Sequence, residues 1–258
     1  MLRSSLRVEV VQATPAPRDI AANLETTAAM VEASAADVIV FPELFLTGYQ
    51  TAALEELAMP TTDARLGSLA ARCAERETAL LVGFIERAAE GYYDAYLAID
   101  ADGTILPAVR KTHLFGAEGD VFLAGDSLDP ITLCGTPIGV INCFELEFPE
   151  VARTLALKGA ALLLAGSANM HPYSEDHRIA STARALENRL PVAYANRVGS
   201  ESGHTFCGFS RIVDRDGSLL GELGEDEQGS LVADLAVNAT VPTEVAMLAQ
   251  RRPELYSG

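Results

Sequence analysis

Lysine and tryptophan are the residues that this chain most clearly lacks. Its 258 residues include no tryptophan and only two lysines, Lys111 and Lys158, and 36 acidic residues against 19 basic ones give a net charge of −17. Such an excess of negative charge repels the phosphates of nucleic acids and of anionic lipid surfaces. We therefore expect neither nucleic acid nor a membrane as a partner, and each of the two lysines needs an explanation.

Paired cysteines and long apolar runs are also absent. The cysteines are Cys73, Cys134, Cys143 and Cys207, and no CxxC spacing occurs, which argues against a disulfide framework or a zinc site. No apolar stretch approaches the ~20 residues of a membrane helix. The N-terminal "MLRSSLRVEVVQATPAP" continues directly into an alternating strand and has no signal-peptide pattern. These features predict a cytoplasmic protein with reduced thiols.

Strand-like and helix-like segments alternate along the chain, which favours an α/β fold. Asp-Gly turns in "DADGT" and "DRDGS" predict hairpins, so the sheet is expected to be mixed. Asp19 and Ser174 are candidate helix N-caps. Strands are predicted at 6–13, 37–41, 79–85, 95–99, 137–143, 161–168, 191–198 and 209–214, and helices at 19–36, 64–78, 148–160 and 174–190.

The domain organisation is expected to be simple. With no linker rich in Pro, Gly or Ser and no low-complexity segment, residues 1–258 are predicted to form one domain. The last stretch, "VPTEVAMLAQRRPELYSG", is too short for a domain and is expected to be a tail that packs on a partner.

Cys143, in "GVINCFELEFPE", is a candidate nucleophile. A buried strand, "PIGVINC", precedes it and a helix is predicted to follow, so it lies at a strand-to-helix turn. Backbone N–H groups at such a turn can lower a thiol pKa and can hold an oxyanion. A small buried hydrophobic residue is an equally good interpretation of this stretch alone.

Glu43 and Lys111 follow two other strand-like runs. Glu43 lies in the apolar "DVIVFPELFLTGY", where a carboxylate is costly unless it is exposed or paired, and a desolvated Glu can act as a general base. Lys111, in "ILPAVRKTHLFGAEGD", stands out in a chain that is poor in lysine, although most lysines are simply solvated. Ligands and catalytic groups of open α/β sheets gather at such strand ends.

Three stretches together resemble the signatures of the nitrilase superfamily, the carbon–nitrogen hydrolases. They are "VIVFPELFLTGY", "RKTHLFG" and "INCFELEFPE", and the similarity continues through "RALENRLPVAYANRVG" and "FCGFSRIVDRDG" to "RRPELY". The resemblance covers essentially the whole chain. It implies a four-layer α-β-β-α sandwich, subunits that pair into a homodimer or larger assembly, and no metal or organic cofactor.

The resemblance also assigns roles to residues. Its Glu–Lys–Cys catalytic set maps onto Glu43, Lys111 and Cys143, and its second glutamate maps best onto Glu118. Glu43 is then the general base, and Cys143 attacks an amide carbonyl to form a thioester. Lys111 and the backbone N–H of Phe144 hold the oxyanion.

Two acidic residues beside Cys143 need separate treatment. Many relatives have Asp where this chain has Glu145, and the sequence does not show the effect on the pocket. Glu147 and Glu150 could both be acidic residues in a helix's first turn, where they favour the helix dipole, and we prefer this interpretation for Glu150.

A Cys–His hydrolase, with His113 or His204 as the base, is the rival enzyme. It explains neither Glu43 nor the scarcity of lysine. His171 and His177 match no standard metal-site spacing and are expected to be surface or structural residues. Cys73, Cys134 and Cys207 are expected to fill core positions.

The predicted reaction is the hydrolysis of a small aliphatic amide to a carboxylic acid and ammonia. Hydrolysis of an N-carbamoyl compound is the first alternative, and nitrile hydrolysis uses the same residues. A subunit that feeds ammonia from glutamine to a separate synthetase is also compatible with the resemblance. From a different class, a non-catalytic binding protein on the same fold is disfavoured because Glu43, Lys111 and Cys143 are all present.

Overall fold

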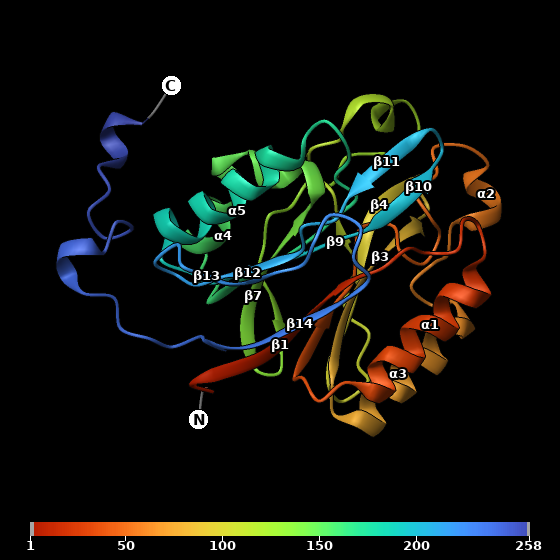
Figure 1. The fold of residues 1–258 in the computed structure, drawn as a ribbon, viewed down its shortest axis with the longest axis horizontal. Helices are drawn as coiled ribbons and strands as arrows, with labels where there is room; N and C mark the ends of the chain where they lie inside the picture. The colour runs from red at the N-terminus through yellow and green to blue at the C-terminus, as the bar shows by residue number, and fades with distance from the viewer. Residues whose placement is uncertain (1–2, 257–258) are drawn as a thin grey trace.

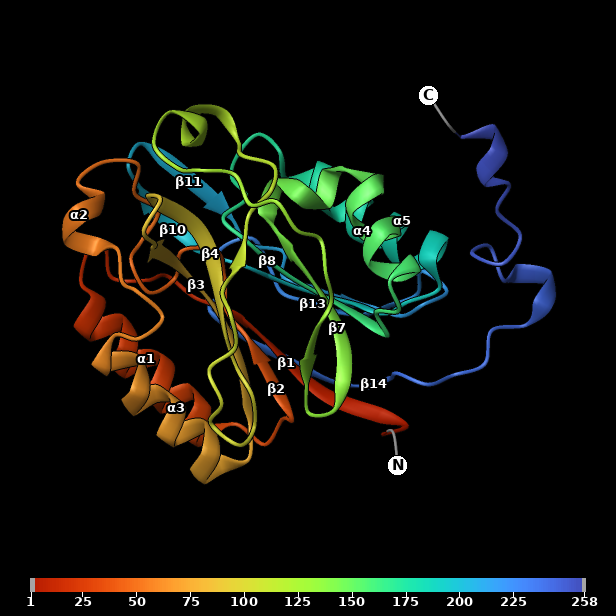
Figure 2. The same cartoon turned by 180° about the vertical axis from the view of Figure 1, so that it is seen from behind.

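Two stacked sheets with helices outside them make up the fold. The computed structural model describes residues 3–256, in which each sheet has six strands and mixed direction (Figure 1). Helices cover the outer face of each sheet, as the reverse view also shows (Figure 2). The predicted α-β-β-α sandwich is thus confirmed. The predicted single domain over residues 1–258 extends past the described residues at both ends and stays a prediction.

The first sheet is built on three parallel strands, β1, β2 and β3, with antiparallel strands at both sides. Its strand order is β14-β1-β2-β3-β4-β5. The bounds are β1 (Ser5–Gln12), β2 (Val38–Val40), β3 (Ala79–Arg87), β4 (Tyr92–Ile99), β5 (Val109–Arg110) and β14 (Gly229–Ala236).

The second sheet repeats this plan with parallel β7, β8 and β9 at its centre. Its order is β13-β12-β9-β8-β7-β6, and β10 and β11 form a separate two-stranded ribbon. The bounds are β6 (Ile131–Leu133), β7 (Thr136–Asn142), β8 (Leu162–Ser167), β9 (Val192–Asn196), β10 (Val198–Glu201), β11 (His204–Cys207), β12 (Arg211–Val213) and β13 (Leu219–Glu222).

Alternate residues of the central strands enter different cores, which explains their continuous apolar sequence. In β8, Leu162 and Leu164 face the other sheet, whereas Leu163 and Ala165 face the helices. Because a strand covered on both faces has no solvent side, every position of such a run is apolar.

Five α-helices and four short 3₁₀ helices connect the strands of the described chain. Helices α1 and α3 pack on the first sheet, and α4 and α5 on the second. The bounds are α1 (Ile20–Ala33), α2 (Leu54–Leu57), α3 (Ala64–Arg76), α4 (Pro149–Leu157), α5 (Ser174–Asn188), η1 (Gly116–Asp120), η2 (Cys143–Glu147), η3 (Thr243–Val245) and η4 (Pro253–Leu255).

One predicted cap is right and the other is wrong. The Asp19 carboxylate accepts from the Ala22 N–H at 3.0 Å, as an N-cap should. Ser174 is instead the first helical residue of α5, and Tyr173 occupies the cap position without a side-chain bond. The turn at "DRDGS" does join antiparallel β12 and β13, with Gly217 at φ +86°.

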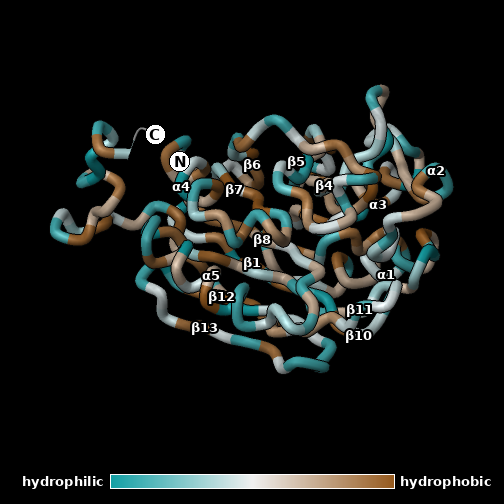
Figure 3. The backbone as a smooth tube through the Cα atoms, turned by 90° about the horizontal axis from the view of Figure 1, so that it is seen from above, coloured by the Kyte–Doolittle hydropathy of each residue, from teal (hydrophilic) through white to brown (hydrophobic). Residues whose placement is uncertain are grey.

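The chain after β14 leaves the body of the fold. Figures 1 and 3 both show this segment running away from the two sheets. The Arg189 guanidinium, at the end of α5, donates to the Val245 carbonyl at 3.2 Å. In residues 3–256, no helix has both the length and the apolar character needed to cross a membrane.

Candidate active site

The three signature stretches meet where strands of the two sheets end. Glu43 follows β2, Lys111 follows β5, and Cys143 follows β7 directly. Glu43 and Lys111 are fully buried, and the Lys111 ammonium is hydrogen-bonded to a Glu43 carboxylate oxygen. The fold therefore brings together residues that lie 100 positions apart in the chain (Glu43 to Cys143).

Lys111 lies among three buried carboxyl groups. Its ammonium contacts Glu43, Glu118 at 2.8 Å and Asp94 at 3.3 Å. Burial opposes its positive charge, but the three surrounding carboxyl groups raise its pKa well above the ordinary value. These carboxyl groups could together ligate a metal ion, yet the ammonium already supplies the positive charge that they surround.

Asp94 is a site residue that the sequence analysis missed. It lies in β4, is fully buried, and its carboxyl group accepts from the Asn142 side-chain amide at 2.9 Å. Burial and the neighbouring Glu43 carboxylate raise the pKa of Asp94 well above its usual range, which favours the neutral acid. The signal was present in "YYDAYLAI", where Asp94 interrupts an apolar strand just as Glu43 interrupts another.

Glu118 belongs to the same network, as its place in the sequence suggested. It lies in η1 and one of its carboxylate oxygens accepts from the Tyr49 hydroxyl at 2.7 Å. The other oxygen accepts from the Lys111 ammonium and from the Phe115 backbone N–H at 2.8 Å. Glu118 is thereby fixed in one orientation beside Lys111.

Cys143 lies in a strained turn that opens on a pocket. Its φ is +46°, a value that residues other than glycine rarely adopt, and it begins η2 rather than an α-helix. The predicted helix, α4, starts six residues later at Pro149. Cys73 and Cys207 are buried, as predicted, whereas Cys134 is partly exposed like Cys143 and does not fill the core position predicted for it.

The Cys143 thiol has a raised pKa. Burial and the Glu43 carboxylate raise it well above the ordinary value, while the Lys111 ammonium and a hydrogen bond from Ser167 act in the opposite direction. The Ser167 hydroxyl lies 3.2 Å from Sγ. Because the raised pKa keeps the thiol protonated near neutral pH, its attack on a substrate requires a base.

Glu145 connects the strand ends that carry Lys111 and Cys143. One of its carboxylate oxygens accepts from both the backbone N–H and the hydroxyl of Thr112 at 2.6 Å, and the other accepts from the Asn142 N–H at 2.7 Å. Thr112 follows Lys111, and Asn142 precedes Cys143. The effect of Glu145 that the sequence left open is therefore to join the two loops.

Gly83 makes room for the loop that carries Glu43. A Cβ atom at this position in β3 would collide with the backbone of Glu43 and Leu44. Leu44 itself has a φ of +51°. The close passage of two backbone segments thus sets the position of the Glu43 carboxylate, and only glycine permits it at this distance.

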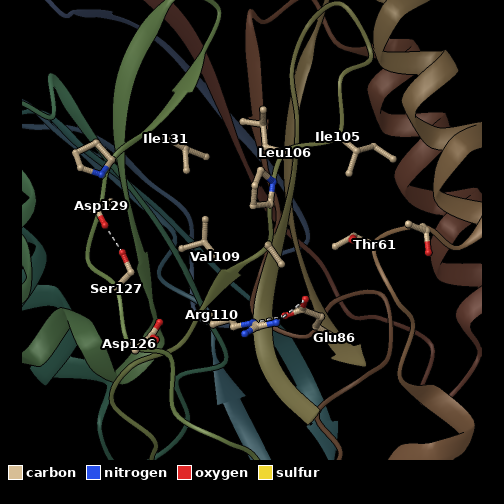
Figure 4. A pocket seen from close by; sticks show the side chains of 14 residues that line it. Thr61, Glu86, Ile105, Leu106, Val109, Arg110, Asp126, Ser127, Asp129 and Ile131 are labelled. Carbon is tan, nitrogen blue, oxygen red and sulfur yellow. Dashed lines mark hydrogen bonds and ion pairs between the residues drawn. The ribbon is translucent and has the colours of Figure 1, made fainter. Parts of the chain in front are cut away.

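A small pocket leads to Cys143. It has an empty volume of about 300 Å³ and carries the carboxylates of Glu118 and Glu147. The aromatic side chains Phe115, Phe144 and Tyr173 form part of its wall, with Phe115 in edge contact with the other two rings. A larger cleft, with an empty volume of about 1660 Å³, is lined by the segments that lead into β5 and β6. It includes the Arg110–Glu86 ion pair (Figure 4).

Three of the four histidines lie apart from the thiol. His113 packs against Phe148, His204 is exposed beside Tyr49, and His171 pairs with Glu225 on the surface. Within residues 3–256, the side chain hydrogen-bonded to Sγ is Ser167 and not a histidine. Neither His113 nor His204 therefore occupies the position of the base that a Cys–His hydrolase requires.

Of the two roles predicted for His177, surface or structural, the structure excludes the first. His177 is buried and lines the pocket, so it is not a surface residue, and its Nε2 lies 3.3 Å from the Glu147 carboxylate. Glu147 accordingly belongs to the pocket wall. Glu150 lies in the first turn of α4, as preferred from the sequence.

The carbon–nitrogen hydrolase family matches residues 7–244 of this chain. The chain belongs to this family, the nitrilase superfamily, and is a carbon–nitrogen hydrolase. A hydrolase from Pseudomonas protegens is 40% identical, over 98% of this chain and 91% of its own. An (R)-stereoselective amidase from a Pseudomonas species is 35% identical, over 86% and 82%.

Solved structures of an amidase from Nesterenkonia sp. are also similar. A mutant of that amidase in complex with butyramide is 29% identical, has a TM-score of 0.85, and is matched over 98% of this chain and 97% of its own. Another mutant, 30% identical with a TM-score of 0.83 over the same shares, carries the acetamide moiety of fluoroacetamide on its active-site cysteine. The (R)-stereoselective amidase and the Nesterenkonia sp. amidase together place the chain in the amidase branch of the superfamily.

Proposed function

We propose that this hydrolase is an amidase that cleaves small aliphatic amides to a carboxylic acid and ammonia through a thioester on Cys143. The observation that carries the proposal is the buried Lys111 ammonium, held by Glu43 and Glu118 beside the Cys143 thiol at the pocket. A base, a cation and a nucleophile are the groups that acyl transfer from an amide needs.

The first half of the reaction forms the thioester. Glu43 takes the Sγ proton as sulfur attacks the amide carbonyl carbon, whose oxygen becomes an oxyanion. The Lys111 ammonium and the Phe144 N–H hold this oxygen. Of the contacts that Lys111 makes, the one to Asp94, at 3.3 Å, is the longest and the one that an oxyanion can replace. Glu43 then passes its proton to the leaving nitrogen, and ammonia departs.

The second half restores the enzyme. Glu43 takes a proton from water as the water oxygen attacks the thioester carbonyl, and the same two donors hold the new oxyanion. Collapse of the tetrahedral intermediate breaks the C–S bond and releases the carboxylic acid, and Glu43 returns the proton to the sulfur. Glu118, fixed by Tyr49 and Phe115, orients Lys111 through both halves.

Pocket size and lining support a small acyl group. The empty volume of about 300 Å³ includes open space at the mouth, so the enclosed part is small, and aromatic rings supply much of the wall. Butyramide, the ligand of the Nesterenkonia sp. amidase mutant, is a short aliphatic amide. N-carbamoyl compounds and nitriles remain the alternative substrates, because thiol attack begins all three reactions.

We also propose a homodimer that pairs through the outer helices of the second sheet. Leu157 on α4 and Ile179 and Leu186 on α5 are exposed, with Ile179 at 66% of its full accessible area. The segment after β14 lies next to this face, where Arg153 and Leu157 share a groove with Met247 and Tyr256. Association would cover these apolar side chains. The cytoplasm is the proposed location.

A substrate panel tests the proposed function. Ammonia release is measured with short aliphatic amides, dicarboxylic acid monoamides, N-carbamoyl compounds and matching nitriles, with Cys143→Ala as the blank. We expect the short neutral amides to give the highest kcat/KM. Faster turnover of nitriles or N-carbamoyl compounds than of every amide would replace the amidase proposal and leave the three catalytic residues in place.

A further inference from the structure

A second hydrogen-bonded chain reaches the sulfur from the side of the second sheet. Asn142 of β7 pairs with Gly166 of β8, so the next residues, Cys143 and Ser167, lie side by side. The Ser167 hydroxyl is fully buried, 3.2 Å from Sγ and 3.4 Å from the His177 Nδ1. Neither Ser167 nor His177 has a role in the mechanism given above.

The Ser167 hydroxyl lies within hydrogen-bond distance of Sγ and of the His177 Nδ1, and its neighbours decide which of the two accepts its proton. The Tyr194 hydroxyl lies 2.9 Å from the His177 Nδ1. Burial raises the pKa of Tyr194 well above its ordinary value, so it remains a phenol that can donate. When Tyr194 donates to Nδ1, that nitrogen has no lone pair left, and the ring proton lies on Nε2, facing the Glu147 carboxylate at 3.3 Å.

The remaining bonds of Ser167 direct its proton to the sulfur. The Asn169 backbone N–H donates to the Ser167 oxygen at 3.0 Å. With the His177 Nδ1 engaged by Tyr194, the Ser167 hydroxyl donates to Sγ. A hydroxyl that donates to sulfur favours the charged thiolate over the neutral thiol.

We propose that Ser167 is a further catalytic residue, which donates a hydrogen bond to the Cys143 thiolate, and that His177 and Tyr194 are positioning residues that direct its proton there. Ser167 keeps its proton throughout, and the thiol proton still goes to Glu43. This inference deepens the proposed amidase function and rests on Cys143 as its nucleophile. Other groups that act on the sulfur charge are Glu43 after β2, Lys111 after β5, and Glu118 in η1.

Alkylation of Cys143 by iodoacetamide across pH tests the proposal without any amide turnover. In Ser167→Ala we expect the rate at pH 7.5 to fall about tenfold and the profile to move up by about one pH unit, the effect of losing one hydrogen bond to a charged group. Ser181→Ala is the matched control, because this buried serine donates to the Arg178 carbonyl and not to sulfur. It should keep the wild-type profile.

A second variant tests the orientation of the Ser167 hydroxyl while Ser167 itself stays in place. Tyr194→Phe removes the donor to His177, so Nδ1 becomes free to compete for the Ser167 proton, and the profile should move in the same direction by a smaller amount. Thermal unfolding confirms that each variant is folded. A wild-type profile in folded Ser167→Ala would overturn the proposal, and if that variant does not fold, a wild-type profile in Tyr194→Phe would overturn it. Failure of the wild type to release ammonia from any amide would refute the proposed function instead.

Discussion

Lys111 shows how one residue can organise a site. Three carboxyl groups surround its buried ammonium, so removing it leaves negative charge without a partner in the interior. In the proposed mechanism it is also the charged donor to the oxyanion. Its importance follows from both roles, and they can be tested separately.

Activity should depend strongly on Lys111 and Glu43. We expect Lys111→Ala to lower kcat by about 100-fold or more, because one oxyanion donor is lost. Glu43→Gln should be comparably damaging because the thiol loses its base. Steady-state ammonia release is the measurement, with His113→Ala as the control. Near-normal rates in Glu43→Gln together with loss in His113→Ala would favour the Cys–His hydrolase.

Thiol ionisation should respond to these two residues in opposite directions. Burial and the Glu43 carboxylate raise the Cys143 pKa, and the Lys111 ammonium lowers it. Glu43→Gln should therefore move the iodoacetamide profile of Cys143 to lower pH although turnover is lost, and Lys111→Met should move it to higher pH. Shifts of the same sign in both variants would contradict the electrostatic account.

Some residues were predictable and others were not, for physical reasons. Four site residues could be identified from the sequence, because each is unusual for its segment or matches a family signature. They are Glu43, Lys111, Glu118 and Cys143. Ser167 and His177 carry no such signal. Their significance arises from the register of β7 with β8 and from the packing of α5, which one sequence does not contain.

Among the elements, the loops after β5 and β7 depend on each other through Glu145. Glu145→Gln should remove an acceptor for Thr112 or for Asn142, and so loosen Lys111 relative to Cys143. We expect kcat to fall about tenfold with little change in KM, because a single hydrogen bond to a charged group is lost. Glu150→Gln, a change on the exposed first turn of α4, is the control and should leave kcat unchanged. Equal kcat values for the two variants would refute the connecting role.

Strands and α-helices follow from the sequence more reliably than the turns between them. Continuous apolar runs correctly predicted β3, β7, β8 and β9, because both faces of each of these strands are packed in a hydrophobic core. The η2 turn was not predicted. Its geometry depends on the positive φ of Cys143 and on the Glu145 bonds to Thr112, in the loop after β5, and to Asn142, at the end of β7. It is therefore a tertiary effect.

For the whole molecule, the exposed apolar face of α4 and α5 predicts association. Light scattering at micromolar concentration should give at least twice the mass of one chain. Ile179→Asp should shift the protein towards the monomer, because a buried charge at the interface has no partner. Leu219→Asp, a change at an exposed residue of β13, is the control. A strict monomer in the wild type would contradict the prediction.

The charge of the whole pocket predicts which amides are poor substrates. Its lining includes the carboxylates of Glu118 and Glu147, and its one lysine neighbour is already surrounded by carboxyl groups. A dicarboxylic acid monoamide should therefore have a kcat/KM at least about tenfold below that of the matching neutral amide, since like charges repel in a poorly solvated site. Glu147→Gln should reduce the difference in kcat/KM between the charged and the neutral amide. An unchanged difference in kcat/KM would mean that Glu147 does not select substrates by charge.

The most direct test of covalent amide hydrolysis at Cys143 is mass spectrometry of the quenched enzyme during turnover of a slow amide. We expect a mass increase equal to the acyl group on the peptide that contains Cys143, and no such increase in Cys143→Ala. Burial raises the pKa of Cys73 to about 12 and those of Cys134 and Cys207 to about 11, and neither Glu43 nor Lys111 is among the groups that shift these three pKa values. An acyl group on any other residue, or continued ammonia release by Cys143→Ala, would contradict the account.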